Sequence, residues 1–442
     1  MFLSNVPIVA RMLLDPRFIR FLCQLQRQFS TDGRLALRAY TKSLLALARG
    51  ERIRRFRGQY LLSSFVPPMP SRAFVRFLEG TARDEADGDL MENLSRLRRT
   101  APLSTYVAVT ERCTYKCAHC SARFGTPGRD LTTAQWIQII RSLQDVGTAY
   151  LGITGGEPLL RNDLEQILAA IDDRSTTILF TNGSQLSLAR AQSLRRSGLF
   201  ALAVSLDSPH ERKHNEIRGH AQAFERALAA VRHARRAGLY TVVQSVVSKS
   251  DLSRETLFRL FRLVREHGAH EIRLHQPALA GALLENRSAD DVLFSEQDRQ
   301  KMFAIQFDAN RRFFGLPKVS SFPYTEGPDK FGCCAGILHS YVTAQGELTP
   351  CDFIPVSFGN VLQGDLRDLY ARMRDAMGGA HLRCVAMRIG ALLRDRELPV
   401  RGEEAEEICR SVAANECARF YQEIRSPRYN PCVAACTPSE AP

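Results

Sequence analysis

The sequence Cys113-Thr114-Tyr115-Lys116-Cys117-Ala118-His119-Cys120 gathers three cysteines in one short stretch, directly after an apolar run that predicts a β-strand. The spacings of three and two residues let three thiolates bind one inorganic cluster. A cubane of four irons then keeps one iron without a protein ligand. The alternative is a zinc site with His119 as the fourth ligand. Because His119 lies between two of the cysteines, its side chain is poorly placed to reach the same ion, so the stretch favours an iron–sulfur centre.

A second motif, Gly155-Gly156-Glu157-Pro158, follows the next predicted strand. Two glycines let a ligand approach the backbone closely, and the proline stiffens the turn. Glu157 offers a carboxylate for an ammonium group. Alone, this tetrapeptide is an ordinary turn at the end of a strand. One helix after the three-cysteine stretch, it becomes a specific signal for a ligand site.

Short apolar runs predict six strands, separated by segments with helical spacing of apolar residues. The runs lie at Tyr106–Val109, Tyr150–Thr154, Thr177–Phe180, Ala201–Leu206, Thr241–Val247 and Ile272–His275. One intervening helix begins at a capping box, Thr132 to Gln135, and ends at Gly147. Strands that alternate with helices pair in parallel, and their chemistry collects at the carboxyl ends. We expect an α/β fold with a partly closed barrel over residues 101–285.

Composition and charge narrow the class of protein. The chain has 442 residues, 45% hydrophobic and 24% charged, which is typical of a globular protein. It shows no apolar run long enough to span a membrane and no signal peptide, so we expect a cytoplasmic protein with reduced cysteines. Residues 1–60 hold twelve Lys and Arg against three acids, or nine of the thirteen net positive charges. This basic arm suits an anionic membrane surface, an acidic peptide or a solvated helix face.

The three-cysteine stretch and the Gly155–Pro158 turn together resemble the radical S-adenosylmethionine (SAM) superfamily, over about Thr105 to Gly281. The resemblance implies a partial (β/α)6 TIM-like barrel. It also implies a [4Fe-4S] cluster, held by Cys113, Cys117 and Cys120, whose open iron binds the amino and carboxylate groups of SAM. Family members usually carry an aromatic residue before the last cysteine, and His119 replaces it here.

The resemblance also assigns roles beyond the cysteines. It implies that Gly155, Gly156 and Glu157 bind SAM. It also implies that Ser205 and Arg218 approach the SAM ribose and carboxylate, and that Asn182 and Asp207 line the cavity. The alternative for each of the last four is a capped turn or a surface charge, since turns favour Asn-Gly and Asp. Gln244 on the fifth strand and His275 after the sixth are also candidates to point inward, although a lone Gln or His at a strand end is more often simply hydrogen-bonded.

A second set of cysteines follows the predicted barrel. Cys334, Gly346 and Cys351 form a C-x11-G-x4-C unit that resembles the SPASM or twitch extension, which carries auxiliary [4Fe-4S] clusters. The glycine suits a hairpin that brings the two cysteines together. We expect one auxiliary cluster on Cys334, Cys351 and Cys384. The fourth ligand of this cluster is unassigned, and the candidates for it are Cys333, Cys417, Cys432 and Cys436. Structural zinc is the rival at this site.

These expectations divide the chain into a basic helical N-terminal region (1–100), the barrel (101–285) and a small Cys-rich SPASM/twitch-like region (286–442). The resemblance implies reductive cleavage of SAM and hydrogen abstraction from a peptide or lipid-type substrate, with flavodoxin or ferredoxin as electron donor. Residues 1–100 do not show the strand–strand–helix order of a leader-peptide module, and residues 1–60 are expected to contact the inner membrane face peripherally. No nucleic-acid partner is expected. The alternatives are a non-catalytic iron–sulfur or zinc scaffold, and a radical SAM enzyme for another small molecule.

Overall fold

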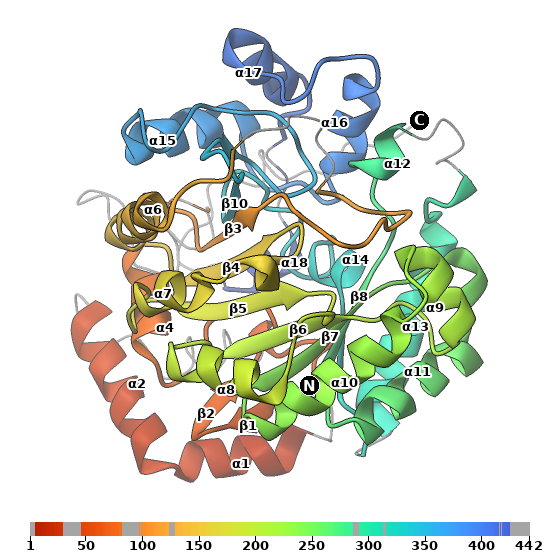
Figure 1. The fold of residues 1–442 in the computed structure, drawn as a ribbon. Helices are drawn as coiled ribbons and strands as arrows, with labels where there is room; N and C mark the ends of the chain where they lie inside the picture. Colours follow the sequence, from red (N-terminus) through yellow and green to blue (C-terminus); the bar gives the residue numbers. More distant parts are fainter. Residues whose placement is uncertain are drawn as a thin grey trace.

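A nine-stranded sheet forms the centre of the computed structural model, which describes residues 5–29, 46–81, 97, 99–122, 129–285, 291–312, 315–414, 416 and 418–424 (Figure 1). The strand order is β11-β10-β3-β4-β5-β6-β7-β8-β9, and every neighbouring pair from β10 to β9 is parallel. All six predicted strands are confirmed, as β3 (Ser104–Thr110), β4 (Tyr150–Gly155), β5 (Thr176–Thr181), β6 (Ala201–Ser205), β7 (Tyr240–Val246) and β8 (Glu271–His275). The sheet is the partial barrel that the sequence predicts.

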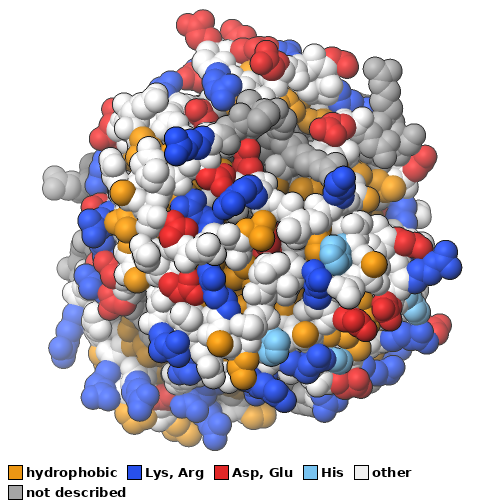
Figure 2. All heavy atoms as spheres, in the orientation of Figure 1, with side chains coloured by type: hydrophobic (Ala, Val, Ile, Leu, Met, Phe, Trp, Pro, Cys, Tyr) orange, Lys and Arg blue, Asp and Glu red, His pale blue; other side chains and the backbone are white. Residues whose placement is uncertain are grey.

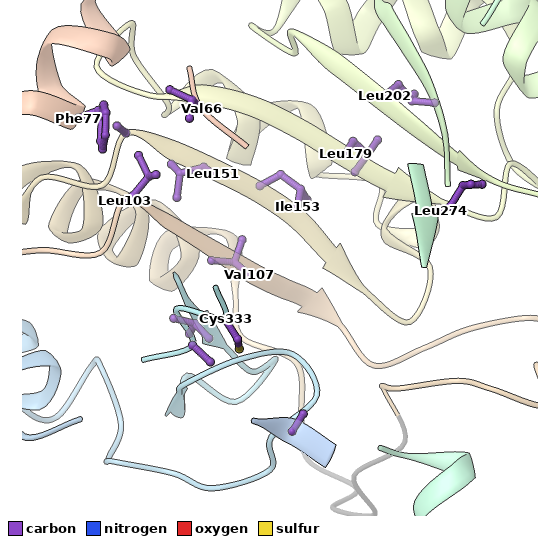
Figure 3. Close-up of a cluster of buried hydrophobic side chains, with 14 of the residues drawn as sticks. Val66, Phe77, Leu103, Val107, Leu151, Ile153, Leu179, Leu202, Leu274 and Cys333 are labelled. Carbon is purple, nitrogen blue, oxygen red and sulfur yellow. The ribbon is translucent and has the colours of Figure 1, made fainter. Parts of the chain in front are cut away.

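Helices between these strands cover the outer face of the sheet (Figure 1). They are α6 (Thr133–Val146), α7 (Leu164–Ala169), α8 (Leu188–Arg196), α9 (Glu211–Arg218), α10 (Ala223–Arg236) and α11 (Arg254–Glu266), with short 3-10 turns η2 (Pro158–Leu160) and η3 (Lys249–Asp251). The predicted capping box starts α6, since the Thr132 and Gln135 side chains each bond the other's backbone N–H, and Gly147 ends the helix. Their apolar faces pack on the strands in one buried cluster. Figure 3 shows strand residues of that cluster, such as Val107, Ile153 and Leu179.

The N-terminal region is helical, with an added hairpin. It contains α1 (Val6–Leu14), α2 (Pro16–Phe29), the antiparallel pair β1 (Arg54–Phe56) and β2 (Gln59–Leu61), and α4 (Arg72–Glu79). The expectation that this region lacks a strand–strand–helix order is therefore wrong. The two-residue turn at Arg57 and Gly58 has positive φ at both positions, the conformation that two-residue hairpins favour. Phe56 packs edge-on against Phe200 and Tyr240, so the hairpin covers the amino ends of the strands.

The C-terminal region continues the sheet rather than standing apart from it. It follows α12 (Ala282–Glu285), the last helix of the barrel region. It contains α13 (Glu296–Arg312), β9 (Lys318–Ser321), α14 (Phe322–Thr325), β10 (His339–Val342), β11 (Leu348–Thr349), α15 (Leu366–Met377), α16 (Ala386–Leu393), α17 (Gly402–Ser411) and α18 (Arg419–Ile424). β9 extends one edge of the sheet beyond β8, and β10 pairs with β3 at the other edge. The barrel strands thus run on past residue 285. Among the described helices, none is both long and apolar enough to cross a membrane.

A buried charge cluster fastens the N-terminal region to this sheet. The Glu51 carboxylate is fully buried and pairs with Lys318 of β9 at 2.8 Å and with Lys330, both also buried. Ser63 and Ser64 donate further hydrogen bonds to it. Burial raises the pKa of Glu51, but the two lysine charges outweigh it and hold the pKa below its ordinary value of 4.5. The carboxylate therefore stabilises the fold above that pH, and the contribution is lost as the pH falls.

Replacing Glu51 with glutamine should leave two buried ammonium groups without a counter-charge. We expect the free energy of unfolding to fall by about 3–5 kcal/mol, the usual cost of removing one partner of a buried ion pair. Urea unfolding at pH 7, followed by circular dichroism, measures this. The control is Glu296→Gln, which breaks an ion pair with Arg299 at the surface and should cost less than about 1 kcal/mol. Equal unfolding midpoints for the two variants would contradict the assignment.

Candidate functional site

The three predicted cluster cysteines share one loop after β3. Cys117 is buried, Cys120 is half-buried and Cys113 is exposed. Three N–H groups face two of the sulfurs: the Tyr115 amide lies 3.4 Å from Cys113 Sγ, Asn182 Nδ2 lies 3.9 Å from the same sulfur, and Arg218 Nη1 lies 3.8 Å from Cys117 Sγ. N–H donors stabilise thiolates. The donor set and its surroundings therefore fit an iron–sulfur cluster.

The Gly155-Gly156 turn holds the start of this loop by direct backbone contact. The Gly156 N–H donates to Thr110 O at 2.8 Å, and the Glu157 N–H donates to Arg112 O at 2.8 Å. A Cβ on Gly155 would lie 2.2 Å from Thr110 O, and one on Gly156 would lie 2.3 Å from Arg112 O. The sequence predicts that a ligand approaches the backbone at these two glycines. The structure shows that the backbone of the cysteine loop itself occupies the space that they leave.

Two more glycines hold the middle and the end of the loop. The Ala118 N–H donates to Ile217 O at 2.9 Å, and a Cβ on the neighbouring Gly219 would lie 2.7 Å from a loop carbonyl. At the end of the loop, the Ala282 N–H donates to Cys120 O at 2.9 Å, and a Cβ on Gly281 would lie 2.2 Å from that oxygen. The loop is therefore fixed along its length by three segments from distant parts of the chain.

The Glu157 carboxylate is turned into the protein. It is fully buried and accepts hydrogen bonds from the Thr181 hydroxyl at 2.7 Å and from the Asn182 and Leu159 amides at 2.8 and 3.1 Å. Burial raises its pKa above the ordinary value. These bonds tie the end of β4 to the end of β5. This geometry differs from the expectation of a free carboxylate for an ammonium group, because three donors within the protein already occupy it.

Asp207 and Arg218 form a buried ion pair beneath the loop. The guanidinium reaches the two carboxylate oxygens at 2.6 and 2.8 Å, and the Val246 amide donates to one of them at 2.9 Å. Burial raises the pKa of Asp207, but the Arg218 charge outweighs it and lowers the pKa to about 2. Two histidines, His119 and His214, flank the carboxylate, and burial lowers the pKa of both to about 4.

The remaining predicted SAM-site residues stand at the carboxyl edge of the sheet. Asn182 follows β5, and its side-chain oxygen accepts the Ser184 amide at 2.8 Å. Ser205 is the last residue of β6 and is half-buried. Arg218, expected at the SAM carboxylate, is instead committed to Asp207 on one side and to Cys117 on the other. The structure thus gathers these side chains around one loop, while their contacts with SAM stay predictions.

The second cysteine set lies around β10 and β11, the two strands that extend the sheet beyond β3. The predicted hairpin is present as β10 and β11, with Gly346 at positive φ in the turn. Cys334, Cys351 and Cys384 line one cavity, together with Cys333. Within the described part of the chain, two groups have all their ligand atoms within 4.8 Å of one another: Glu326, Cys333 and Cys384, and His339, Cys351 and Asp352. The other fourth-ligand candidates, Cys417, Cys432 and Cys436, lie outside the described residues.

The cavity between these cysteines and the barrel interior is lined mainly by apolar and aromatic side chains. They include Phe65, Tyr106, Phe180, Phe322, Phe331 and Phe420. Among the described residues that line it there is no Lys or Arg. Gln244 and His275 reach it from β7 and β8, and the buried atoms Gln244 Oε1 and His275 Nε2 have no hydrogen-bond partner. One polar atom of each side chain is thus left unpaired, which differs from the interpretation of both as ordinary hydrogen-bonded residues. Only the three-dimensional structure shows that these two side chains reach the cavity.

Comparison with known proteins identifies relatives of this fold. Residues 107–263 match the family described as the radical SAM superfamily. A protein of Methanosarcina barkeri named AdoMet-dependent heme synthase is 27% identical over 326 residues, 68% of this chain and 93% of that protein. A protein of the same name from Nitratidesulfovibrio vulgaris is 24% identical over 57% of this chain and 74% of its own. Both matches include most of the relative's length.

Two solved structures share the architecture. Streptococcus suis SuiB bound to precursor peptide SuiA aligns with a TM-score of 0.53 at 17% identity, over 74% of this chain and 84% of that one. The structure described as anSMEcpe with bound AdoMet aligns with a TM-score of 0.51 at 14% identity, over 73% and 95%. At these identities the likeness is one of fold.

Replacing Gly156 with alanine should displace the cysteine loop, because the new Cβ meets a carbonyl of that loop. We expect a severalfold lower iron content per chain after anaerobic reconstitution, with the circular dichroism spectrum kept. Gly364→Ala is the matched control, since a Cβ there meets only the Leu369 side chain at an ordinary 3.4 Å. A Gly156→Ala protein that binds as much iron as the wild type would contradict this role.

Proposed function

We propose that this chain, whose residues 107–263 match the radical SAM superfamily, cleaves SAM reductively and removes hydrogen from a peptide substrate inside its barrel. The observation that carries the proposal is the cysteine loop docked on the Gly155–Gly156 turn, at the carboxyl edge of the sheet. Radical chemistry needs exclusion of water, and the cavity that Tyr106, Phe180 and His275 line from the sheet strands is mainly apolar.

The enzyme uses a [4Fe-4S] cluster and SAM, which when bound would supply the hydrogen-abstracting radical chemistry, given one electron from a donor such as flavodoxin or ferredoxin. Cys113, Cys117 and Cys120 are the proposed cluster ligands. The backbone of Gly155–Glu157 and the side chains of Asn182 and Ser205 form the proposed SAM cradle. Arg218 is a positioning residue, since it orders Asp207 and places positive charge 3.8 Å from Cys117 Sγ.

The cavity favours a neutral substrate with one polar group. Gln244 Oε1 is an acceptor, and burial lowers the pKa of His275 to about 3, so that its imidazole is neutral at pH 7. A peptide amide supplies both the donor and the acceptor that these groups lack. SuiB, which shares the fold, has been solved with a precursor peptide. A lipid-type acyl chain suits the apolar wall but leaves both polar atoms unpaired, which is costly.

A heme-type substrate is the second candidate, because both curated relatives are named AdoMet-dependent heme synthase. Tetrapyrroles carry carboxylates, and proteins usually meet carboxylates with arginine. The described cavity wall offers no such cation and instead contributes Glu326 and Asp352. The lining therefore favours the peptide over the tetrapyrrole. A non-catalytic scaffold is the remaining alternative, and it differs by turning over no SAM.

The first two helices form the proposed membrane contact. Of the six large hydrophobic side chains exposed in the described residues, four lie here: Val6, Leu13, Leu14 and Ile19. Arg11, Arg17 and Arg20 on the same two helices are also exposed. Figure 2 shows basic and apolar side chains along the lower edge, where α1 lies in Figure 1. Exposed apolar side chains together with arginine suit the interface of an anionic bilayer.

Reduced, anaerobically reconstituted protein should convert SAM to 5′-deoxyadenosine, measured by chromatography after incubation with dithionite. Cys117→Ala removes a buried thiol from the loop, and we expect product formation to fall at least tenfold. Cys23→Ala, on the exposed face of α2, should match the wild type. Equal product from the Cys117 variant would overturn the proposed site, and no product from the wild type would favour the scaffold.

Leu14→Ser should weaken sedimentation with phosphatidylglycerol vesicles about tenfold, since burying one leucine contributes about 1.5 kcal/mol. The control is Leu392→Ser, an exposed leucine of α16 on another part of the molecule. Vesicles of phosphatidylcholine should bind the wild type weakly, because they lack the negative charge. Equal binding by both variants would exclude this patch as the membrane contact.

A further inference from the structure

Two arginines from distant parts of the chain meet at the end of α10. Arg57, in the turn of the hairpin β1–β2, donates to Gly238 O, and Arg195, near the end of α8, donates to Ala237 O at 3.2 Å. Burial and the nearby charge of Arg195 lower the pKa of Arg57. Both guanidinium groups bind carbonyl oxygens in these contacts and not carboxylates. Two positive charges therefore lie side by side without being neutralised by them.

Further arginines surround the same hairpin. A Cβ on Gly58 would lie 3.2 Å from Arg17 Nη1 of α2. On the other side, Arg235 of α10 contacts the His270 ring, which packs edge-on against Phe56 of β1 with 5.1 Å between the ring centroids. These contacts bring α2, α8, α10 and the hairpin to one face of the molecule. This face, called the basic face below, lies at the amino ends of the barrel strands.

The basic face has many exposed arginines and little acid. Helices α8 and α10 each run back to the amino edge of the sheet, so their last turns lie on this face. The exposed arginines of these two turns and of the hairpin are Arg55, Arg57, Arg195, Arg196, Arg235 and Arg236. Asp15, just before α2, is half-buried and accepts the Tyr60 hydroxyl at 2.9 Å. Figure 2 shows Lys and Arg side chains along the lower edge, where Figure 1 places the hairpin and α8.

Helix dipoles explain only part of this charge. Arginine in the last turn of a helix complements the helix dipole, which accounts for the arginines of α8 and α10. It does not account for Arg57, which lies in a turn. Nor does it account for Arg17 in the first turn of α2, where a positive charge opposes the dipole. Because like charges that crowd together repel, the basic face indicates an anionic partner.

An anionic bilayer suits this face better than an acidic polypeptide or a nucleic acid does. The basic face continues into α1 and α2, where Leu13 is 53% exposed and Leu14 is 78% exposed, three residues from Arg17. Apolar side chains beside arginine match the boundary between headgroups and acyl chains. A polyanion in water offers no apolar layer for the two leucines. The combination of charge and exposed leucine therefore favours the membrane.

We propose that the amino end of the barrel lies on an anionic membrane, with the basic face adding to the contact made by α1 and α2. This inference rests on the membrane contact proposed above and gives it a second part. In this orientation the cysteine loop, at the carboxyl edge of the sheet, faces away from the bilayer. The substrate then reaches the barrel from the aqueous side, as a peptide in solution does.

A double variant, Arg195→Gln with Arg235→Gln, tests the basic face. The matched control is Arg367→Gln with Arg410→Gln, two exposed arginines of α15 and α17 on the opposite side of the molecule (Figure 1). Each basic side chain near an anionic surface strengthens binding about fivefold. The first variant should therefore sediment with phosphatidylglycerol vesicles about 25-fold more weakly, while the control, which loses the same charge, should match the wild type. Equal 5′-deoxyadenosine formation without vesicles shows that both variants are folded.

Hydrogen exchange measures the orientation of the bound wild type. Phosphatidylglycerol vesicles should slow exchange in the hairpin, residues 54–61, and leave it unchanged at residues 183–187, at the carboxyl edge of the sheet. The reverse pattern would overturn the orientation.

The remaining outcomes separate the basic face from the contact of α1 and α2. Equal vesicle binding by the two double variants, with Leu14→Ser still weakened, would overturn the basic face and leave α1 and α2 as the contact. No vesicle binding by the wild type would overturn both. Binding of the wild type to polyglutamate but not to the vesicles would make the partner an acidic polypeptide and overturn the membrane as the occupant.

Discussion

The site depends on backbone contacts that leave no space for side chains. The cysteine loop has no regular structure of its own, so its conformation must come from what it touches. Thr110 O, Arg112 O and Cys120 O each accept an amide N–H from another segment, and the Gly155-Gly156 turn and Gly281 make these approaches close enough. A loop fixed in this way loses little entropy when it binds a cluster, because its ligands are already ordered.

Charge beneath the loop adds to this constraint. A reduced cluster on three thiolates concentrates negative charge, and the nearest buried cation is Arg218, whose own charge is balanced by Asp207. The pair therefore adds an oriented dipole rather than a free charge to the apolar interior. His119 and His214, both neutral at pH 7, surround the carboxylate without changing this balance. Electrostatic support of this kind tunes a cluster without exposing it to water.

The sequence was sufficient where a pattern has one physical cause. Buried parallel strands are continuous apolar runs between amphipathic helices, so all six central strands could be predicted within two residues. The sequence was insufficient where the role of a residue depends on which atoms surround it in three dimensions. The role of Gly156 requires knowledge of Arg112 O, and Gln244 and His275 are informative only because Gln244 Oε1 and His275 Nε2 are buried without a partner. The edge strand β9 is too short for periodicity to reveal.

The sheet topology explains how the second cysteine set is held against the barrel. β10 pairs with β3, the strand that leads into the first cysteine loop, so the hairpin that ends at Cys351 is fastened to the barrel by main-chain hydrogen bonds. Register places Tyr341 beside Tyr106, whose ring lines the cavity and contacts His339. A centre held on this hairpin cannot move independently of the barrel. The two cysteine sets therefore keep a fixed separation, which a flexible tether between separate domains would not provide.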